Sequence, residues 1–321
     1  MGVQNIISVD FGGTKILSAL INADNEIVSR VKIPTNTEKG NEFLVKSIAN
    51  SVKKILEENN LKENDVKAVC LGVPGTVNPF SGIIGNAPNL GIKDFNIKEA
   101  LAKEIAMPVL IENDVNLAGL GIKKFELRAD VKNMLVVFVG TGIGGAFFFD
   151  GKLYRGSSFF AGEIGHIIVE PKGEFSTFSN RTTFELTASR TAIVRDIKRG
   201  LNKGKKSILK EYKSPQKLLK SKALADALKK EDPLASKCVG KAAVTIGTVL
   251  GSITTLLNID TIVLGGGVIE AMHEFMIPKI EKAFKESVLL EAGKVVKIFE
   301  TKLGDDAALY GGVALAEEFL K

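Results

Sequence analysis

Residues 138–166 combine two kinds of chemistry in one stretch of chain. The stretch begins with a glycine turn between apolar runs, Gly140-Thr141-Gly142-Ile143-Gly144-Gly145, and such turns bring backbone N–H groups close to a phosphate. It ends with Glu163-Ile164-Gly165-His166, where a carboxylate and an imidazole three residues apart can hydrogen-bond a polyhydroxylated substrate. The stretch therefore predicts a phosphate-binding turn followed along the chain by a substrate-binding pair.

Two further glycine clusters stand at the ends of predicted strands. Asp10-Phe11-Gly12-Gly13-Thr14-Lys15 lies between two apolar runs, and Gly265-Gly266-Gly267 would let a nucleotide approach the N-terminus of the helix that follows. Each cluster alone is typical of an ordinary turn, and none has the Gly-x-x-x-x-Gly-Lys-Ser/Thr pattern of a P-loop. Three clusters in one chain favour phosphate binding, with Asp10 placed to reach a Mg²⁺ ion.

A possible general base follows another strand. The run Val109–Ile111 leads into Glu112-Asn113-Asp114, and ligand sites of α/β sheets lie at the carboxyl ends of strands. A carboxylate there can accept the proton of an attacking hydroxyl, as in kinases. Asp114 would serve equally well as the N-cap of a helix over residues 115–124, and the two roles are compatible.

The elements that must position these residues occur twice. Strand, glycine turn, strand, tight turn and strand follow one another over residues 5–33, and the same order recurs over residues 135–154. Two copies of one unit predict two similar α/β lobes facing each other. We expect a small lobe of residues 1–117, joined by a C-terminal helix over 305–321, and a large lobe of residues 118–304.

The remaining elements follow from periodicity and turn residues. Helices are expected at about 41–58, 96–105, 115–124, 184–199, 233–258 and 270–287, and strands at 67–72, 109–111, 261–264 and 295–299. Residues 81–90, with Pro88 and several glycines, predict a loop. In the long helix over 233–258, Gly240, Gly247 and Gly251 are expected to allow close packing.

Composition indicates a folded globular chain. Of the 321 residues 45% are hydrophobic and 25% charged, and the net charge is +6. Much of this charge lies in residues 198–230, which hold twelve Lys or Arg and two acids. We interpret the segment as a solvated helical insertion; the alternative is a site for a polyanion.

The chain carries no obvious targeting signal. It opens directly into a strand, and its longest nearly apolar run, 242–257, is shorter than the roughly 20 residues that a membrane span needs. Cys70 and Cys238 lie in separate apolar segments and are expected to be buried thiols rather than a disulfide. We therefore expect a cytoplasmic protein that binds neither membrane nor nucleic acid.

Several of these motifs together resemble the ROK family of sugar kinases and related repressors. They are Asp10–Lys15, Gly72-Val73-Pro74-Gly75, Glu112–Asn116, residues 138–166 and residues 305–312. The resemblance covers the chain end to end and implies the actin-like, hexokinase-like ATPase fold, with two lobes around a cleft. It also implies that the C-terminal helix packs back on the first lobe, and that the protein is a homodimer.

The resemblance assigns roles residue by residue. Asp114 matches the catalytic base, and a set of polar and glycine positions matches the sugar contacts: Gly75, Asn89, Asn113, Glu163, His166 and Glu185. Other positions match the contacts to ATP: Gly12, Gly13, Thr14, Lys15, Thr141, Gly142, Gly265, Gly266 and Gly267. Asp10 is expected to reach Mg²⁺ through water.

One family feature is missing. Family members hold a structural Zn²⁺ with the His and three cysteines, whereas this chain has Ser176, Phe178 and Thr183 at the cysteine positions. The sequence therefore predicts no structural zinc. Our hypothesis is that Phe175, Phe178 and Phe184 replace it by apolar packing.

The expected function is ATP-dependent phosphorylation of a hexose at its primary hydroxyl, with glucose the leading substrate. Family repressors carry a DNA-binding domain before the first strand, and here Asp10 comes at once, which favours an enzyme. Two alternatives stay open. One is a kinase for fructose, mannose, allose or an N-acetylhexosamine, and the other is a non-catalytic sugar sensor.

Overall fold

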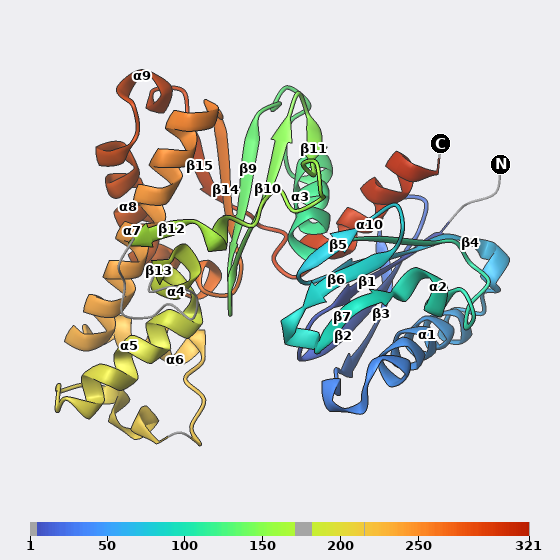
Figure 1. The fold of residues 1–321 in the computed structure, drawn as a ribbon, viewed down its shortest axis with the longest axis horizontal. Coiled ribbons are helices and arrows are strands. Elements are labelled where there is room, and N and C mark those ends of the chain that lie inside the picture. Colours follow the sequence, from blue (N-terminus) through green and yellow to red (C-terminus); the bar gives the residue numbers. More distant parts are fainter. Residues whose placement is uncertain (1–4, 171–181, 215, 321) are drawn as a thin grey trace. The chain divides into compact units, whose positions relative to one another are not determined.

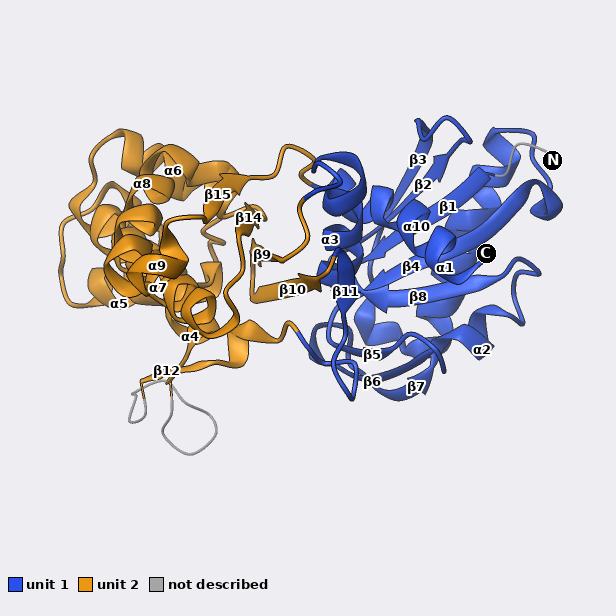
Figure 2. Cartoon of the chain, turned by 90° about the horizontal axis from the view of Figure 1, so that it is seen from above, with its two compact units in different colours: residues 1–130, 151–161, 305–321 blue, residues 131–150, 162–304 orange. Residues whose placement is uncertain are grey.

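The computed structural model of the protein describes residues 5–170, 182–214 and 216–320 (Figure 1). The chain divides into two compact units (Figure 2). Unit 1 comprises residues 1–130, 151–161 and 305–321, and unit 2 comprises residues 131–150 and 162–304.

Unit 1 is built on a five-stranded sheet with the order β3-β2-β1-β4-β8. The strands are β1 (Asn5–Phe11), β2 (Lys15–Ile21), β3 (Ile27–Pro34), β4 (Val66–Val73) and β8 (Val109–Asn113). β1 pairs antiparallel with β2 and parallel with β4, so the sheet is mixed. The chain reverses its direction at the glycine turn between β1 and β2.

A small antiparallel sheet and four helices complete the described part of unit 1. The sheet consists of β5 (Thr76–Asn78), β6 (Ile83–Ala87) and β7 (Ile92–Asn96). The helices are α1 (Asn41–Glu58), α2 (Ile97–Leu101), α3 (Asp114–Phe125) and α10 (Asp306–Phe319), with short 3₁₀ turns η1 (Thr37–Lys39), η2 (Glu63–Asp65) and η3 (Pro88–Leu90). β11 (Lys152–Tyr154) lies in the inserted segment 151–161.

Unit 2 repeats the central arrangement, in the strand order β10-β9-β14-β15. Its strands are β9 (Met134–Val139), β10 (Ile143–Phe149), β14 (Thr261–Gly265) and β15 (Lys297–Glu300). β9 pairs antiparallel with β10 and parallel with β14, as β1 does with β2 and β4. The duplication predicted from the sequence is confirmed by this pairing.

Helices supply the rest of unit 2, together with a two-stranded ribbon. They are α4 (Phe184–Ala188), α5 (Arg190–Asn202), α6 (Ser221–Lys229), α7 (Pro233–Leu257), α8 (Ile269–Ser287) and α9 (Leu290–Gly293), with 3₁₀ turns η4 (Ile164–His166) and η5 (Ile208–Lys213). The ribbon is β12 (Ile168–Glu170) with β13 (Thr182–Thr183). Much of the 198–230 segment is thus helical where the structure describes it.

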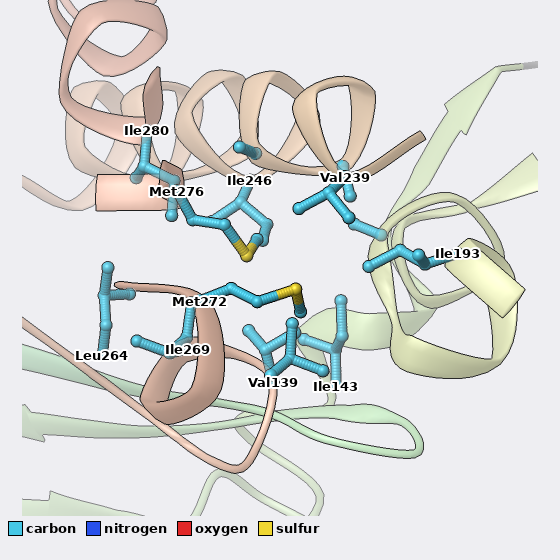
Figure 3. Close-up of a cluster of buried hydrophobic side chains, with 14 of the residues drawn as sticks. Val139, Ile143, Ile193, Val239, Ile246, Leu264, Ile269, Met272, Met276 and Ile280 are labelled. Atoms are coloured by element: carbon cyan, nitrogen blue, oxygen red, sulfur yellow. The ribbon is translucent and has the colours of Figure 1, made fainter. Parts of the chain in front are cut away.

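The core of unit 2 lies between the sheet and helices α7 and α8 (Figure 3). Val139 and Leu264 from the strands face Ile246 of α7 and Met276 of α8. Helix α7 begins at Pro233 because the Asp232 carboxylate caps it, accepting hydrogen bonds from the amides of Leu234 and Ala235.

Close packing of α7 on α8 depends on two of the three glycines that we singled out. A Cβ on Gly247 would lie 2.3 Å from the Ile280 carbonyl oxygen, and one on Gly251 would lie 2.9 Å from Ser287 Cβ. For Gly240 the expectation is wrong, because a Cβ there would meet nothing within 4 Å. By length and composition α7 is apolar enough to span a membrane, and it is longer than the apolar run we considered, but much of it is buried in this core.

Unit 1 extends further along the chain than the small lobe we expect from the sequence. Helices α3 and α10 pack so closely that a Cβ on Gly121 would lie 2.1 Å from the Ala307 carbonyl oxygen. This contact keeps residues 118–130 with unit 1, whereas the predicted boundary lies at 117. It also confirms that the C-terminal helix packs on the first unit.

Two local expectations are wrong. The sequence predicts a loop over residues 81–90, but β6 forms there because it pairs with β5 on one side and β7 on the other. The helix expected over 184–199 is two helices, since Ser189 is extended and caps α5 through the amide of Ala192.

Candidate functional site

The turn between β1 and β2 is a tight hairpin held by its own backbone. The Gly12 amide donates to the Lys15 carbonyl at 3.0 Å. Thr35 ties the turn to the end of β3, since its hydroxyl donates to the Gly12 carbonyl at 2.7 Å and its amide donates to the Thr14 carbonyl at 3.1 Å. The predicted phosphate turn in unit 1 is therefore ordered by hydrogen bonds on both sides.

Gly13 brings this turn against one of the predicted sugar contacts. A Cβ at Gly13 would lie 2.9 Å from the carbonyl oxygen of Asn89 in η3, so a larger residue would push the turn away. Asn89 itself is exposed. Within unit 1, a predicted phosphate residue and a predicted sugar residue are thus direct neighbours.

Asp10 carries an unusual charge environment. Burial raises the pKa of the Asp10 carboxyl to about 6, with Lys15 lowering it and Asp305 raising it. Lys15 forms an ion pair with Asp305, so its positive charge is shared between two carboxylates. An aspartate with an incompletely compensated charge is suited to a nearby cation.

Asn113 holds the turn that carries the predicted base. Its Oδ1 accepts hydrogen bonds from the amides of Val115 at 2.9 Å and Asn116 at 3.1 Å, which makes Asn113 the N-cap of α3. Its Nδ2 donates to the Gly75 carbonyl at 3.0 Å. The structure therefore brings Asn113 and Gly75 together and gives the capping role to Asn113 rather than to Asp114.

Asp114 is the first residue of α3, directly after the carboxyl end of β8. Its Oδ1 accepts a hydrogen bond from the Val115 amide at 2.9 Å, and a carboxylate in the first turn of a helix is stabilised by the helix dipole. Gly75 has φ of +92°, and a Cβ on it would lie 2.2 Å from the Asn86 carbonyl oxygen, so only glycine fits beside Asn113.

In unit 2, the turn between β9 and β10 is tied to the start of α5. The Arg190 amide donates to the Gly140 carbonyl at 2.9 Å, and its guanidinium donates to the Thr141 hydroxyl at 2.5 Å. The Thr191 hydroxyl donates to the Thr141 carbonyl at 2.8 Å. The second predicted phosphate turn is thus held at both Gly140 and Thr141, and Arg190 is a cation at this turn that sequence reasoning missed.

Glu185 lies against this turn. Its Oε2 accepts a hydrogen bond from the Ile143 amide at 2.8 Å, and a Cβ on Gly142 would lie 2.3 Å from the same oxygen. Gly165 also lies close to Glu185. A Cβ added to Gly165 would lie 2.4 Å from the Ile143 carbonyl oxygen and 3.3 Å from Glu185 Cβ. Two glycines therefore make the space that Glu185 occupies.

The predicted pair Glu163 and His166 is also close in the structure, with His166 Nε2 3.8 Å from Glu163 Oε2. Burial raises the pKa of the Glu163 carboxyl, while His166 lowers it and Glu185 raises it. The side chain of His166 is 78% exposed. Glu163, His166 and Glu185 thus form one polar group on unit 2, able to accept and donate hydrogen bonds to hydroxyls.

Gly265, Gly266 and Gly267 connect β14 to α8. Gly266 has φ of +88°, and a Cβ there would lie 2.7 Å from the Val139 carbonyl oxygen. A Cβ on Gly267 would meet nothing within 4 Å, so the backbone is open to approach at this point.

Two hollows border the first turns of α8. One, of about 430 Å³, lies between α6 and α8 and is lined by Ala225, Leu228, Lys229 and residues 270–275. The other, of about 510 Å³, is lined by Glu270, Glu300, Thr301, Lys302 and Gly304. Sequence reasoning missed these lining residues, because the pairing of α6 with α8 brings together residues that are distant in the chain.

The zinc hypothesis falls partly outside the described residues. Ser176, Phe175 and Phe178 lie there, whereas Thr183 caps α4 and Phe184 is fully buried in the core of unit 2. Within residues 5–170, 182–214 and 216–320, no group of three or more His, Cys, Asp and Glu side chains is arranged to hold a metal ion. The sequence has only two cysteines, Cys70 and Cys238, so it lacks the three thiolates that the family's zinc site uses.

Comparison with known protein families gives one match over nearly the whole chain. The model of the ROK family matches residues 6–319. The chain is 33% identical to a glucokinase of Halalkalibacterium halodurans over 97% of its own length and 94% of that enzyme. It is 25% identical to a xylose repressor of Caldicellulosiruptor bescii, over 98% of its own length and 78% of the repressor.

Solved structures show the same relationship. A ROK family glucokinase from Streptomyces griseus, solved in complex with glucose and AMPPNP, superposes with a TM-score of 0.82. It is 27% identical, and the match covers 99% of this chain and 100% of that one. The hexokinase-like α/β fold predicted from the sequence is therefore confirmed.

Proposed function

The chain belongs to the ROK family, and from this premise we propose that it is an ATP-dependent sugar kinase that converts glucose to glucose 6-phosphate. The observation that carries the proposal is the Asn113–Asp114 turn. Asn113 caps α3, and the Asp114 carboxylate follows directly at the carboxyl end of β8, the position at which α/β sheets bind ligands.

Asp114 is the general base of the proposed reaction. Its carboxylate takes the proton of the primary hydroxyl as that oxygen forms a bond to the γ-phosphorus. The bond from the γ-phosphorus to the β–γ bridging oxygen breaks, and ADP leaves. General-base help of this kind contributes about 10²–10⁴ in rate.

The residues proposed to contact the sugar form one group in unit 1 and another in unit 2. Asn113, Asn89 and the Gly75 turn are held together in unit 1, and Glu163, His166 and Glu185 form the polar group of unit 2. Carboxylates, an imidazole and an amide suit a ligand with many hydroxyls, because together they offer both donors and acceptors.

ATP and Mg²⁺ fit the residues present. The turns at Gly12–Lys15 and Thr141–Gly142 would take the phosphates, and the hollows beside Gly265–Gly267 would take the nucleoside. Asp10, whose pKa is raised by burial, would hold Mg²⁺ through water. When bound, the ion neutralises charge on the phosphates.

We further propose that the protein is a cytoplasmic homodimer that binds no nucleic acid. A sugar-responsive regulator is the other candidate, and the similarity to a xylose repressor favours it. The higher identity to a glucokinase, over nearly all of that enzyme, favours the kinase.

The discriminating experiment couples ADP release to an optical assay across a panel of hexoses and N-acetylhexosamines. We expect glucose to give the highest kcat/KM. A sugar other than glucose with the highest value would change the substrate but keep the kinase. No turnover on any sugar, together with sugar-dependent binding to DNA or a protein, would overturn the proposed function.

A further inference from the structure

An ion-pair network built on a buried glutamate, Glu112, lies directly beside the proposed base. Glu112, the last residue but one of β8, is 1% exposed. Its Oε2 accepts a hydrogen bond from Arg155 Nε at 2.6 Å. Its Oε1 accepts hydrogen bonds from the Asn113 amide at 3.0 Å and from Asn116 Nδ2 at 3.1 Å. Both oxygens of one buried carboxylate are therefore occupied by three donors.

Arg155 connects this carboxylate to the C-terminal helix. Its two terminal nitrogens donate to both oxygens of Glu318 on α10, at 2.7 and 3.2 Å. The Arg155 side chain is 11% exposed, and its Cζ lies 5.6 Å from the centre of the Phe319 ring. The planar guanidinium of Arg155 thus binds two carboxylates at once through N–H donors in a fixed geometry. A lysine ammonium does not reproduce this geometry.

The network fixes the residues on either side of Asp114. Glu112 binds the backbone of Asn113, which precedes Asp114, and the side chain of Asn116, which follows it in the first turn of α3. Asn116 is 1% exposed, and among the described residues its Oδ1 has no hydrogen-bond partner. The bond to Glu112 therefore orients this side chain.

Arg155 also orders the segment that leads to Glu163. Its carbonyl accepts a hydrogen bond from the Ala161 amide at 3.1 Å, and Gly156, with φ of +73°, turns the chain between them. Ala161 precedes Gly162 and Glu163 in the sequence. The same residue thus braces the base and the start of the segment that carries a proposed sugar contact.

We infer that Arg155 is a positioning residue: anchored by Glu318, it fixes Glu112 and, through Glu112, the Asn113–Asp114 turn. The inference rests on the proposed function for its consequence in catalysis. It goes beyond that function because the side chains of Arg155, Glu112 and Glu318 do not touch the substrates in the proposed reaction.

The test compares variants that weaken the network with matched variants that do not. Arg155→Lys keeps the positive charge but loses the fixed set of guanidinium donors, and Arg155→Met removes both the charge and the donors. Glu318→Gln weakens only the interaction of Arg155 with α10. Glu317→Gln is the control, since the neighbouring Glu317 pairs with Lys124 outside the network. Arg30→Lys is a second control, because Arg30 pairs with Asp306 at the other end of α10.

We expect Arg155→Lys and Glu318→Gln to lower kcat by about 10-fold to 10²-fold, because small displacements of a catalytic group have effects of this size. The KM for glucose should change less than kcat, since Arg155 and Glu318 do not themselves contact the sugar in the proposed reaction. Both controls should keep the wild-type kcat. If Arg155→Met does not fold, the Lys and Gln variants carry the test.

A second measurement does not depend on activity. In the wild type the amides of Val115 and Asn116 donate to Asn113 Oδ1 and should be protected from hydrogen exchange. In Arg155→Lys and Glu318→Gln their exchange should be faster by about tenfold, but not in Glu317→Gln.

The outcomes separate the two ideas. An inactive wild type whose exchange responds as described would refute the kinase and keep the positioning role. An active wild type with unchanged kcat and unchanged exchange in the Arg155 and Glu318 variants would overturn the positioning role. The positioning role would also be overturned if all variants, controls included, lost the same thermal stability and none showed a selective change in hydrogen exchange.

Discussion

The Oε2 atom of Glu185 accepts a hydrogen bond from the Ile143 amide at 2.8 Å, in the space left by Gly142. A residue proposed to bind sugar is thus held by the turn proposed to bind phosphate. That turn is itself tied to α5 through Gly140 and Thr141. The position of Glu185 therefore depends on the turn as well as on the packing of its own helix.

The first prediction concerns this space. In Gly142→Ala, the three atoms nearest to the added Cβ all belong to the Glu185 carboxylate, at the far end of its side chain, so the fold should be kept while Glu185 turns away. We expect the KM for glucose to rise about tenfold or more, because a hydrogen bond to a charged group is lost. Steady-state kinetics measure this. Gly140→Ala is the control for glucose KM, since a Cβ there meets nothing within 4 Å.

The second prediction separates the two bonds of Asn113. Asn113→Ser keeps an oxygen that can cap α3 but cannot reach the Gly75 carbonyl, whereas Asn113→Ala loses both interactions. The free energy of unfolding of Asn113→Ala should be lower than that of Asn113→Ser by about 1 kcal/mol, the usual contribution of an N-cap side chain. Urea unfolding measures the difference. Equal stability of the two variants would mean that capping is not what Asn113 contributes.

The third prediction is a pH dependence of stability through Asp10. The carboxyl has a pKa of about 6 in the folded protein, against an ordinary value of 3.8 for an aspartate in the unfolded chain. Between these values the folded state binds more protons than the unfolded state, so the contribution of Asp10 to stability falls as pH rises through this window.

Asp10→Asn lacks this effect. The free energy of unfolding of the variant, relative to the wild type, should therefore increase from about pH 4 to about pH 7, by up to about 3 kcal/mol. Urea unfolding in EDTA at both pH values checks it. A difference that is constant or decreases with pH would show that the pKa is not raised.

The fourth prediction concerns zinc. Because the chain has only Cys70 and Cys238, and neither is near His166 in sequence, the purified protein should contain far less than one zinc per chain. EDTA should leave its thermal midpoint unchanged. Elemental analysis is the check, and one tightly held zinc per chain would refute the hypothesis that apolar packing replaces the metal.

The features predicted well from the sequence are local. Each glycine turn and its two flanking strands can be found because alternation, apolar runs and Gly act over a few residues, and the second copy over 135–149 supports the first. The cap of α7 at Asp232-Pro233 is equally local. Asn113 and Asp114 can both cap a helix, so local pattern does not decide which of them does.

The features that were missed depend on distant partners. Residues 83–87 form β6 against β5 and β7 although Gly82, Gly85 and Pro88 indicate a loop, since tertiary pairing overrides propensity. Arg155 is 43 residues from Glu112 and 163 from Glu318. No local pattern marks such a network, and only the folded chain reveals it.

The most direct test of the proposed function is the turnover of Asp114→Asn. If the carboxylate is the general base, kcat for glucose should fall by about 10² to 10⁴, while calorimetry should still detect glucose binding. Asp306→Asn is a matched control, because Asp306 is likewise the first residue of a helix, and it should retain wild-type turnover. An Asp114→Asn variant that turns over glucose at the wild-type rate would contradict the account.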